Sequence, residues 1–235
     1  MSIDPTKLPD PPMPSYTFTI YNRDLFEKSK FKNYDSLLER RLARCQARAN
    51  YLASILENDN VHENKRAREK VPKTTSTQFV NVFINDKEIP LNPSLSTWNF
   101  GNDMTGGCIV DTGTTITRFP QDFYSVFRDT FRKEVRDIPM VNVPPGSFDT
   151  CYKDDPSAQE PNFPVVKLYF GHKKPENLLL LEQQRVVVHF AGMYCLGFMA
   201  WNQSLALLGG AQLQGIGLTF DTSKNTLSFD LDVCD

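Results

Sequence analysis

The sequence predicts an all-β, largely antiparallel body with one inserted helix, preceded by an amphipathic N-terminal helix. From Thr75 onward, short apolar and β-branched runs alternate with turn residues, a pattern typical of strands. Few helical patterns separate these runs, which favours an antiparallel all-β body over alternating β-α-β units. Ahead of Thr75, apolar residues recur at steps of four and three, the period of a helix with one apolar face.

The composition is that of an ordinary globular protein and excludes few classes of function. The 235 residues are 40% hydrophobic and 23% charged, as in an ordinary globular protein, and the formal net charge is -2. Such a charge predicts neither a nucleic-acid partner nor a membrane partner. The first residues show no basic stretch followed by an apolar segment, so no signal peptide is recognised and localisation stays open.

The N-terminal part divides into two predicted regions. Residues 1–23 are rich in proline and lack helical periodicity, which predicts a disordered leader. Residues 24–70 are predicted to hold a basic helix and a polar, charged linker. The third region, residues 71–235, carries the strand pattern.

The predicted helix covers residues 35–58. Asp35 or Ser36 is expected to cap it, with Ser36 and Glu39 at the spacing of a capping box. One apolar stripe is formed by Leu38, Leu42, Cys45, Ala49, Leu52 and Leu56. The basic residues, which lie mainly off this stripe, are Arg40, Arg41, Arg44 and Arg48. The stripe suits a partner surface, a membrane or the rest of the chain, and docking on its own domain is the favoured interpretation.

The strand pattern begins with a hairpin predicted over residues 79–91, where FVNVFIND turns back into KEIPL. Further strands are predicted at 164–170, 178–181, 185–190, 194–200, 205–210, 215–221 and 226–231. The inserted helix is PQDFYSVFRDTFRKEV, with Pro120 in its first turn. Its apolar face is formed by Phe123, Phe127, Phe131 and Val135.

The segment CIVDTGTTITRFP (108–120) carries an aspartate, Asp111, on a turn between two apolar runs. Gly113 allows the chain to double back just after the aspartate. The hydroxyls of Thr112 and Thr114 are near enough in sequence to hydrogen-bond its carboxylate. An ordinary Asp-x-Gly turn is the alternative interpretation of these residues alone.

The longer segment GGCIVDTGTTITRFPQDFYSVFRDTF resembles the second active-site segment of pepsin-like aspartic proteases, especially their plant nepenthesin-like branch. The resemblance continues through SFDTCY (147–152), YCLGF (194–198) and LALLGG (205–210) to the C-terminal GIGLTFDTSKNTLSFDLDVC. It therefore implies a single pepsin-like C-terminal lobe over residues 71–235, related to the C-terminal domain of plant xylanase inhibitors. The basic helix resembles the propeptide of the same branch.

For function, the resemblance implies peptide-bond hydrolysis by a water held between two aspartates, one acting as base and the other as acid. Asp111 takes the place of the aspartate of the C-terminal lobe, supported by Thr112, Gly113 and Thr114. Thr112 is expected to form hydrogen bonds across the lobes, and Thr114 to bond the carboxylate. The expected substrate is a polypeptide, and neither a cofactor nor a metal is implied.

One departure from the family is large. A polar linker stands where the family has an N-terminal lobe with the first Asp-Thr-Gly and a flap. We therefore expect the lone lobe to be weak or inactive, unless a second copy of the chain or a separate N-terminal lobe supplies the other aspartate. The alternative is a non-catalytic binding module of the xylanase-inhibitor type. The family is secreted or vacuolar.

Five cysteines and one sequon are candidate sites of disulfide formation and glycosylation. By resemblance, Cys151 and Cys195 form the disulfide of the C-terminal lobe. Partners for Cys45, Cys108 and Cys234 are not assigned. Asn202 begins the sequon Asn-Gln-Ser, a glycosylation acceptor if the chain is secreted.

Overall fold

The computed structural model describes residues 33–59, 76–77, 79–91, 95, 107–154, 161–171, 174–221 and 226–231. The predicted leader (1–23) lies outside the described residues, as do Cys234 and the linker from residue 60 to residue 75. In the described part, no helix is long and apolar enough to span a membrane.

The described strands form four sheets, which confirms the all-β prediction. The five-stranded sheet runs β1-β4-β12-β5-β11 and consists of Ser76–Thr77, Cys108–Asp111, Ala206–Gly209, Thr117–Pro120 and Phe198–Trp201. The four-stranded sheet runs β3-β2-β7-β8 and consists of Lys87–Ile89, Phe79–Ile84, Val166–Phe170 and Leu178–Leu181. The smaller sheets are β6-β10-β9 (Cys151–Lys153, Met193–Leu196, Val187–Phe190) and the hairpin β13-β14 (Gly217–Asp221, Thr226–Asp230).

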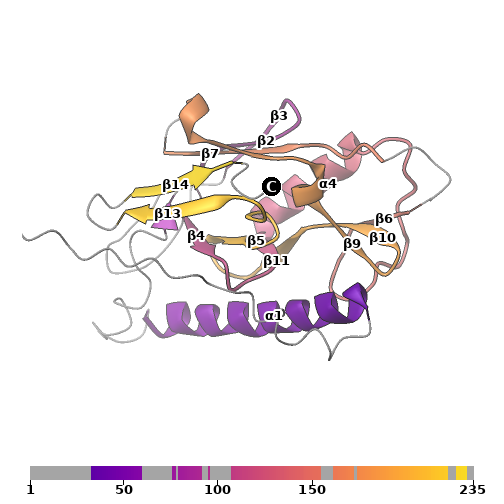
Figure 1. Cartoon of the computed structure of the whole chain (residues 1–235), viewed down its shortest axis with the longest axis horizontal. Helices are drawn as coiled ribbons and strands as arrows, with labels where there is room; N and C mark the ends of the chain where they lie inside the picture. Colours follow the sequence, from indigo (N-terminus) through magenta and orange to yellow (C-terminus); the bar gives the residue numbers. More distant parts are fainter. Residues whose placement is uncertain are drawn as a thin grey trace, which may run out of the picture.

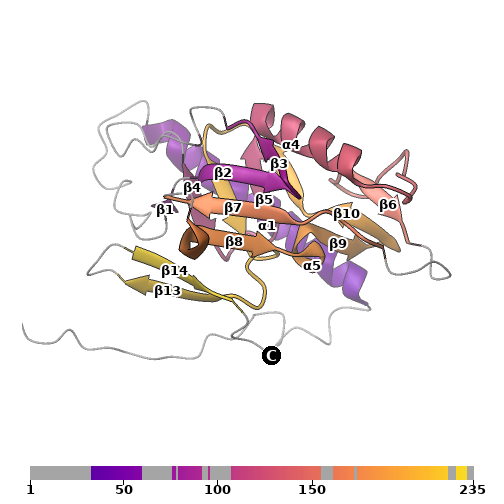
Figure 2. The same cartoon turned by 90° about the horizontal axis from the view of Figure 1, so that it is seen from above.

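The helices are α1 (Tyr34–Asp59), α4 (Gln121–Glu134), the short α5 (Gln183–Val186) and the 3-10 turn η5 (Pro175–Asn177). In Figures 1 and 2, α1 and the β3-β2-β7-β8 sheet lie on opposite sides of the body, with the five-stranded sheet between them. The β13-β14 hairpin projects at one end.

The predicted hairpin is present as β2 and β3, with Asn85 at a positive φ of 52° in its turn. Two features depart from the predicted pattern. The expected strand 185–190 begins as the helix α5 and becomes β9 only at Val187. In the five-stranded sheet, the pairs β4–β12 and β5–β11 are parallel, and the strands of each pair are separated by more chain than the crossover that parallel strands need.

The inserted helix α4 packs its predicted face inward. Phe123, Phe127 and Phe131 are buried, and Val135 packs against the same core. The helix begins at Gln121, directly after Pro120, which ends β5. Phe119 of β5 packs edge-to-face against Phe127 of α4, with centroids 5.2 Å apart, and stacks on Phe198 of β11 at 5.4 Å.

The stripe of α1 docks on the chain's own five-stranded sheet. Leu38, Cys45, Ala49 and Leu52 are at most 6% exposed. The first two pack in one cluster with Ile116 and Met199, and the last two pack in another with Ile109 and Trp201. The favoured interpretation, docking within the chain, therefore describes this structure, and burial of the stripe fixes α1 in place by the hydrophobic effect.

The predicted cap of α1 was wrong by about half a turn. Asn33 caps the helix: its Oδ1 accepts from the Ser36 amide at 2.9 Å, and Ser36 Oγ accepts from the Asn33 amide at 3.3 Å. Asp35 instead accepts from the Ala191 amide at 3.1 Å, which ties the start of α1 to the β9–β10 turn. A tertiary contact thus uses the carboxylate that the sequence pattern assigned to the cap.

Candidate active site around Asp111

Asp111 is the last residue of β4, and strand alternation decides which way it faces. Side chains of a strand point alternately to its two faces. Cys108 and Val110 lie in the main core, whereas Ile109 lies in the cluster beneath α1. Asp111 therefore shares the face of Ile109, the face that α1 covers.

The turn after Asp111 holds its carboxylate with two local donors. The Gly113 amide donates to Oδ1 at 3.0 Å, and the Thr114 hydroxyl donates to Oδ2 at 2.9 Å. The turn itself is closed by the Thr114 amide, which donates to the Asp111 carbonyl at 3.1 Å. Thr114 is fully buried, so this arrangement is fixed by its surroundings.

Glycine at residue 113 leaves room for the Asp111 carboxylate. A Cβ placed there would lie 3.1 Å from Asp111 Oδ1 and 3.8 Å from Arg48 Nε. A side chain at this position would push on the carboxylate. The Thr112 side chain is exposed, and among the described residues its hydroxyl has no hydrogen-bond partner, so its predicted cross-lobe role stays a prediction.

The third group on the carboxylate comes from α1. Arg48 Nε donates to Asp111 Oδ2 at 3.2 Å, across 63 residues of sequence. The Asp111 side chain is 12% exposed and that of Arg48 is 44% exposed. The same guanidinium lies 5.8 Å from the ring centroid of Tyr51. The sequence places Arg48 off the apolar stripe of the helix, and no pattern in it indicates that Arg48 meets Asp111.

The loop that carries Asp111 is threaded past the end of β12, the strand within LALLGG (205–210). The Gly210 amide donates to Thr114 O at 2.7 Å, and the Ala211 amide donates to Thr115 O at 2.8 Å. Thr117 Oγ1 accepts from the Gly209 amide at 2.9 Å and donates to Gln212 Oε1 at 2.6 Å. Backbone and buried side-chain hydrogen bonds together therefore fix the position of the Asp111 turn relative to the end of β12.

Gly209→Ala is expected to lower the free energy of unfolding by about 1–3 kcal/mol, as overpacking of a tight site does. A Cβ at Gly209 would meet three backbone atoms, the closest being Ile116 C at 2.8 Å. Gly210→Ala is the matched control, because its Cβ would meet nothing closer than 3.5 Å. Urea unfolding of both variants measures the difference, and equal losses would contradict the threading argument.

The remaining predicted residues lie away from this turn. Cys151 and Cys195 are direct cross-strand partners on β6 and β10 and form a disulfide. Cys45 and Cys108 are buried free thiols. Burial raises the pKa of Cys108 well above its ordinary value, so its thiol stays protonated and is a poor nucleophile. Asn202 is exposed between β11 and β12, and its glycosylation stays a prediction.

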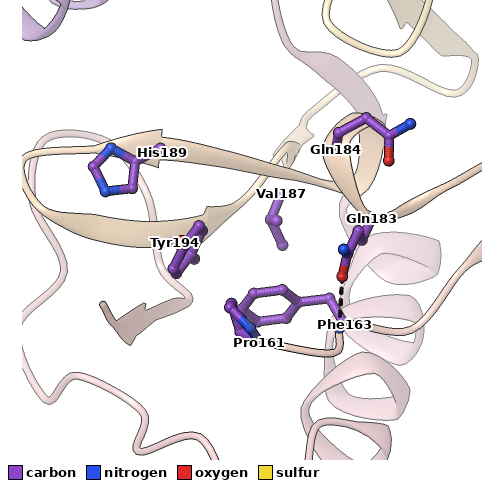
Figure 3. A pocket seen from close by; sticks show the side chains of 7 residues that line it. All are labelled: Pro161, Phe163, Gln183, Gln184, Val187, His189 and Tyr194. Carbon is purple, nitrogen blue, oxygen red and sulfur yellow. Dashed lines mark hydrogen bonds between the residues drawn. The ribbon is translucent and has the colours of Figure 1, made fainter. Parts of the chain in front are cut away.

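A hollow of about 320 Å³ lies beside β9 and β10, away from Asp111 (Figure 3). Two of its polar residues have partners: Gln183 Oε1 accepts from the Phe163 amide at 3.3 Å, and His189 Nε2 lies 2.9 Å from Asp154 Oδ2. Asp111, which belongs to a different sheet, does not line it.

Among the described residues, the groups that contact the Asp111 carboxylate are Gly113, Thr114 and Arg48, and none of them is an acid. The arrangement supplies one oriented carboxylate able to accept a proton from water. Proton donation to a substrate oxygen needs a further group.

Comparison with known proteins matches residues 77–230 to the family model described as "Xylanase inhibitor C-terminal". The Arabidopsis thaliana protein ASPARTIC PROTEASE IN GUARD CELL 2 is 33% identical over 129 residues, which are 55% of this chain and 27% of that protein. Aspartic proteinase nepenthesin-1 from Nepenthes gracilis is 27% identical over 146 residues, 62% of this chain and 32% of that protein. The chain thus spans about a third or less of these two relatives.

Among solved structures, the one titled "Crystal structure of edgp" superposes with a TM-score of 0.58 at 22% identity. The superposition covers 67% of this chain and 39% of that one. At this identity the likeness concerns the fold, and the partial coverage of the longer chain corresponds to a single lobe.

Proposed function

Because this chain belongs to the plant aspartic protease family, as a lobe of the Xylanase inhibitor C-terminal type, we propose that it carries one half of an aspartic endopeptidase centre. The observation that supports this most directly is the carboxylate of Asp111, oriented by Gly113 and Thr114 on a threaded turn. Asp111 acts as the base that takes a proton from the attacking water.

The acid partner is a second carboxyl group, brought by another copy of the chain or by a separate lobe. Two carboxyl groups that share one proton cannot both ionise at short distance, and this divides the roles of base and acid between them. The lone lobe is therefore weak or inactive, and its cleavage rate per chain rises with chain concentration if copies pair.

Non-catalytic binding is the second candidate, and the Arg48 contact favours it. Arg48 occupies Oδ2, one of the two oxygens that would otherwise take the proton from water, and α1 covers the same sheet face. A module that binds without catalysis has no need of a free carboxylate. This alternative also accords with the name of the matching family model.

The test separating the two candidates is cleavage of an unfolded protein at acid pH over a range of chain concentrations, together with the mass of the particle in solution. The enzyme proposal expects cleavage that a statine-type peptide blocks, since such a peptide imitates the tetrahedral intermediate. No cleavage at any concentration, by the wild type or by the Arg48 variant below, contradicts the pairing of two copies and leaves a separate lobe or the binding module.

Arg48→Gln is expected to raise that cleavage by no more than about fivefold, because ion pairs of exposed residues contribute about 0.2–1 kcal/mol. Arg48 is 44% exposed, so the same change should hardly alter stability. Arg136→Gln is the matched control, since Arg136 is exposed and lies on the loop after α4. A lower rate in Arg48→Gln alone would show that Arg48 assists Asp111 rather than competing for it.

A further inference from the structure

Arg118 is a buried cation whose described contact partners are all neutral. It lies on β5 and is 4% exposed. Its Nη2 donates to Gln46 Oε1 at 2.9 Å and lies 3.8 Å from Cys45 Sγ, and its Nη1 lies 3.5 Å from Ala200 O. All three acceptors are neutral.

No described carboxylate lies within ion-pair distance of this guanidinium, and its buried Nε has no hydrogen-bond partner. An arginine cannot relieve its burial by losing a proton, because its pKa is far above the physiological range. An unpaired buried charge is unfavourable unless a counter-charge approaches it. Within the part of the chain that the structure describes, Arg118 is therefore a cationic group without an anion.

The guanidinium lies at the wall of a cavity of about 210 Å³. Gln46 and Ala200, which it contacts, both line this cavity, together with Gln121 and Ser147. Pockets for drug-sized ligands measure about 300–1,000 Å³, so this cavity suits a smaller group. Its lining adds neutral amides and a hydroxyl beside the cation.

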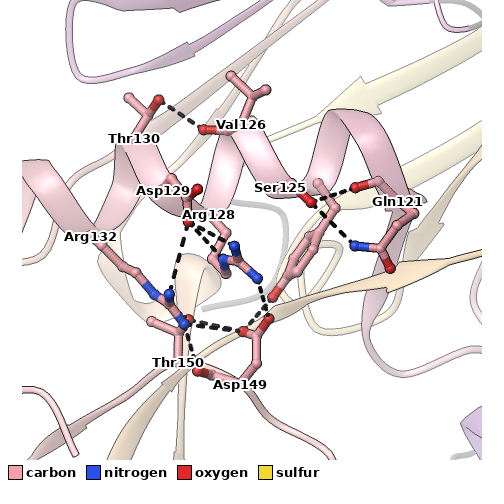
Figure 4. Close-up of polar contacts among 10 residues, drawn as sticks. Gln121, Ser125, Val126, Arg128, Asp129, Thr130, Arg132, Asp149 and Thr150 are labelled. Atoms are coloured by element: carbon pink, nitrogen blue, oxygen red, sulfur yellow. Dashed lines mark hydrogen bonds and ion pairs between the residues drawn. The ribbon is translucent and has the colours of Figure 1, made fainter.

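Asp149, the one acid among the lining residues, is engaged by other groups (Figure 4). Its Oδ1 accepts from the Tyr124 hydroxyl at 2.7 Å, and its Oδ2 accepts from Arg128 Nη1 at 3.2 Å. Its backbone carbonyl accepts from Arg132 at 2.7 Å. Asp149 thus leaves Arg118 uncompensated, while its own charge disfavours a multiply charged anion in the cavity.

We propose that this cavity binds a single carboxylate group, with Arg118 as its counter-charge. Arg recognises carboxylates well because its planar fork of donors matches the two oxygens. The site is separate from Asp111: Gln46 and Arg48 are two residues apart on α1, about 200° around the helix. Carboxylate binding at Arg118 consequently does not depend on the proposed peptidase chemistry.

The test is thermal unfolding of the full chain with sodium propionate, compared with sodium chloride at equal ionic strength. Wild type should show a saturating rise in Tm, roughly 3–6 °C at about ten times the dissociation constant. Arg118→Met, which keeps much of the volume without the charge, should lose this rise. Arg136→Met, an exposed control with the same charge change, should keep it.

A second variant keeps the test decisive if Arg118→Met does not fold. Gln46→Glu puts a carboxylate where Oε1 already lies 2.9 Å from Arg118 Nη2. It should raise the Tm without propionate and reduce the propionate effect. A wild-type Tm insensitive to propionate, or an undiminished rise in Arg118→Met or Gln46→Glu, would overturn the proposal.

The source of the carboxylate is distinguished by a capped peptide, acetyl-Gly-Glu-Gly-amide, which carries a side-chain carboxylate and no free terminus. A larger Arg118-dependent rise with the peptide than with propionate identifies an acidic side chain of a polypeptide as the ligand. A larger rise with propionate identifies a free small acid. Both outcomes support carboxylate binding, and they differ only in what carries the group.

Discussion

Replacing Asp111 by asparagine is expected to lower acid-pH cleavage of an unfolded protein by about 10²–10⁴-fold, the usual contribution of a positioned acid or base. An asparagine amide keeps the size and one carbonyl oxygen of the carboxylate, so the hydrogen bond from Thr114 Oγ1 can persist. It cannot take a proton from water. The loss is therefore specific to the chemistry and not to folding.

The measurement compares initial cleavage rates of Asp111→Asn and wild type at the same chain concentration and pH. Asp137→Asn is the matched control: Asp137 is exposed and has a φ of 63°, a conformation that asparagine adopts readily. Its cleavage rate should stay at the wild-type value. If Asp111→Asn cleaves as fast as wild type, Asp111 is not the base and the peptidase proposal fails.

Phe119→Ala is expected to lower the free energy of unfolding by about 3–5 kcal/mol, the cost of removing a fully buried aromatic ring from a core. The Phe119 side chain is 0% exposed. Its ring lies 5.0 Å from that of Phe123, 5.2 Å from that of Phe127 and 5.4 Å from that of Phe198. The Phe119 ring thus joins β5, α4 and β11. Its removal would leave a cavity between all three elements.

Urea unfolding measures this loss, and Phe220→Ala provides the same substitution on the surface. Phe220 is 40% exposed on β13, in the hairpin that projects from the body. Its replacement by alanine should lower the free energy of unfolding by about 1 kcal/mol or less. Comparable losses in the two variants would mean that the ring cluster around Phe119 is not the stabilising contact between α4 and the sheet.

Strand and helix identity followed from local patterns, because burial of one face needs a fixed spacing of apolar residues. The strand segments in FVNVFIND and KEIPL became β2 and β3, and the stripe of Phe123, Phe127 and Phe131 became the buried face of α4. Residues 185–190 show the limit of this reasoning. A short apolar run suits helix and strand equally, and there the chain uses one after the other.

For the candidate site, the aspartate and its local donors were visible in the sequence, because Asp111, Gly113 and Thr114 lie within one turn. Arg48 was not, since it meets Asp111 only after α1 has docked. The Arg118 cavity was missed for the same reason: Gln46 and Arg118 are 72 residues apart. No periodicity in either segment indicates that they meet.

The sequence by itself therefore determined the all-β class, the two long helices, their apolar faces and the turn that presents Asp111. Each depends on spacing within a short segment, which backbone geometry translates directly into a face or a turn. Only the tertiary structure decided that α1 covers the sheet face of Asp111, that Arg48 binds its carboxylate and that Arg118 is buried with no counter-charge among the described residues. These contacts join distant segments, and their partners are selected by packing of the whole lobe rather than by any local pattern.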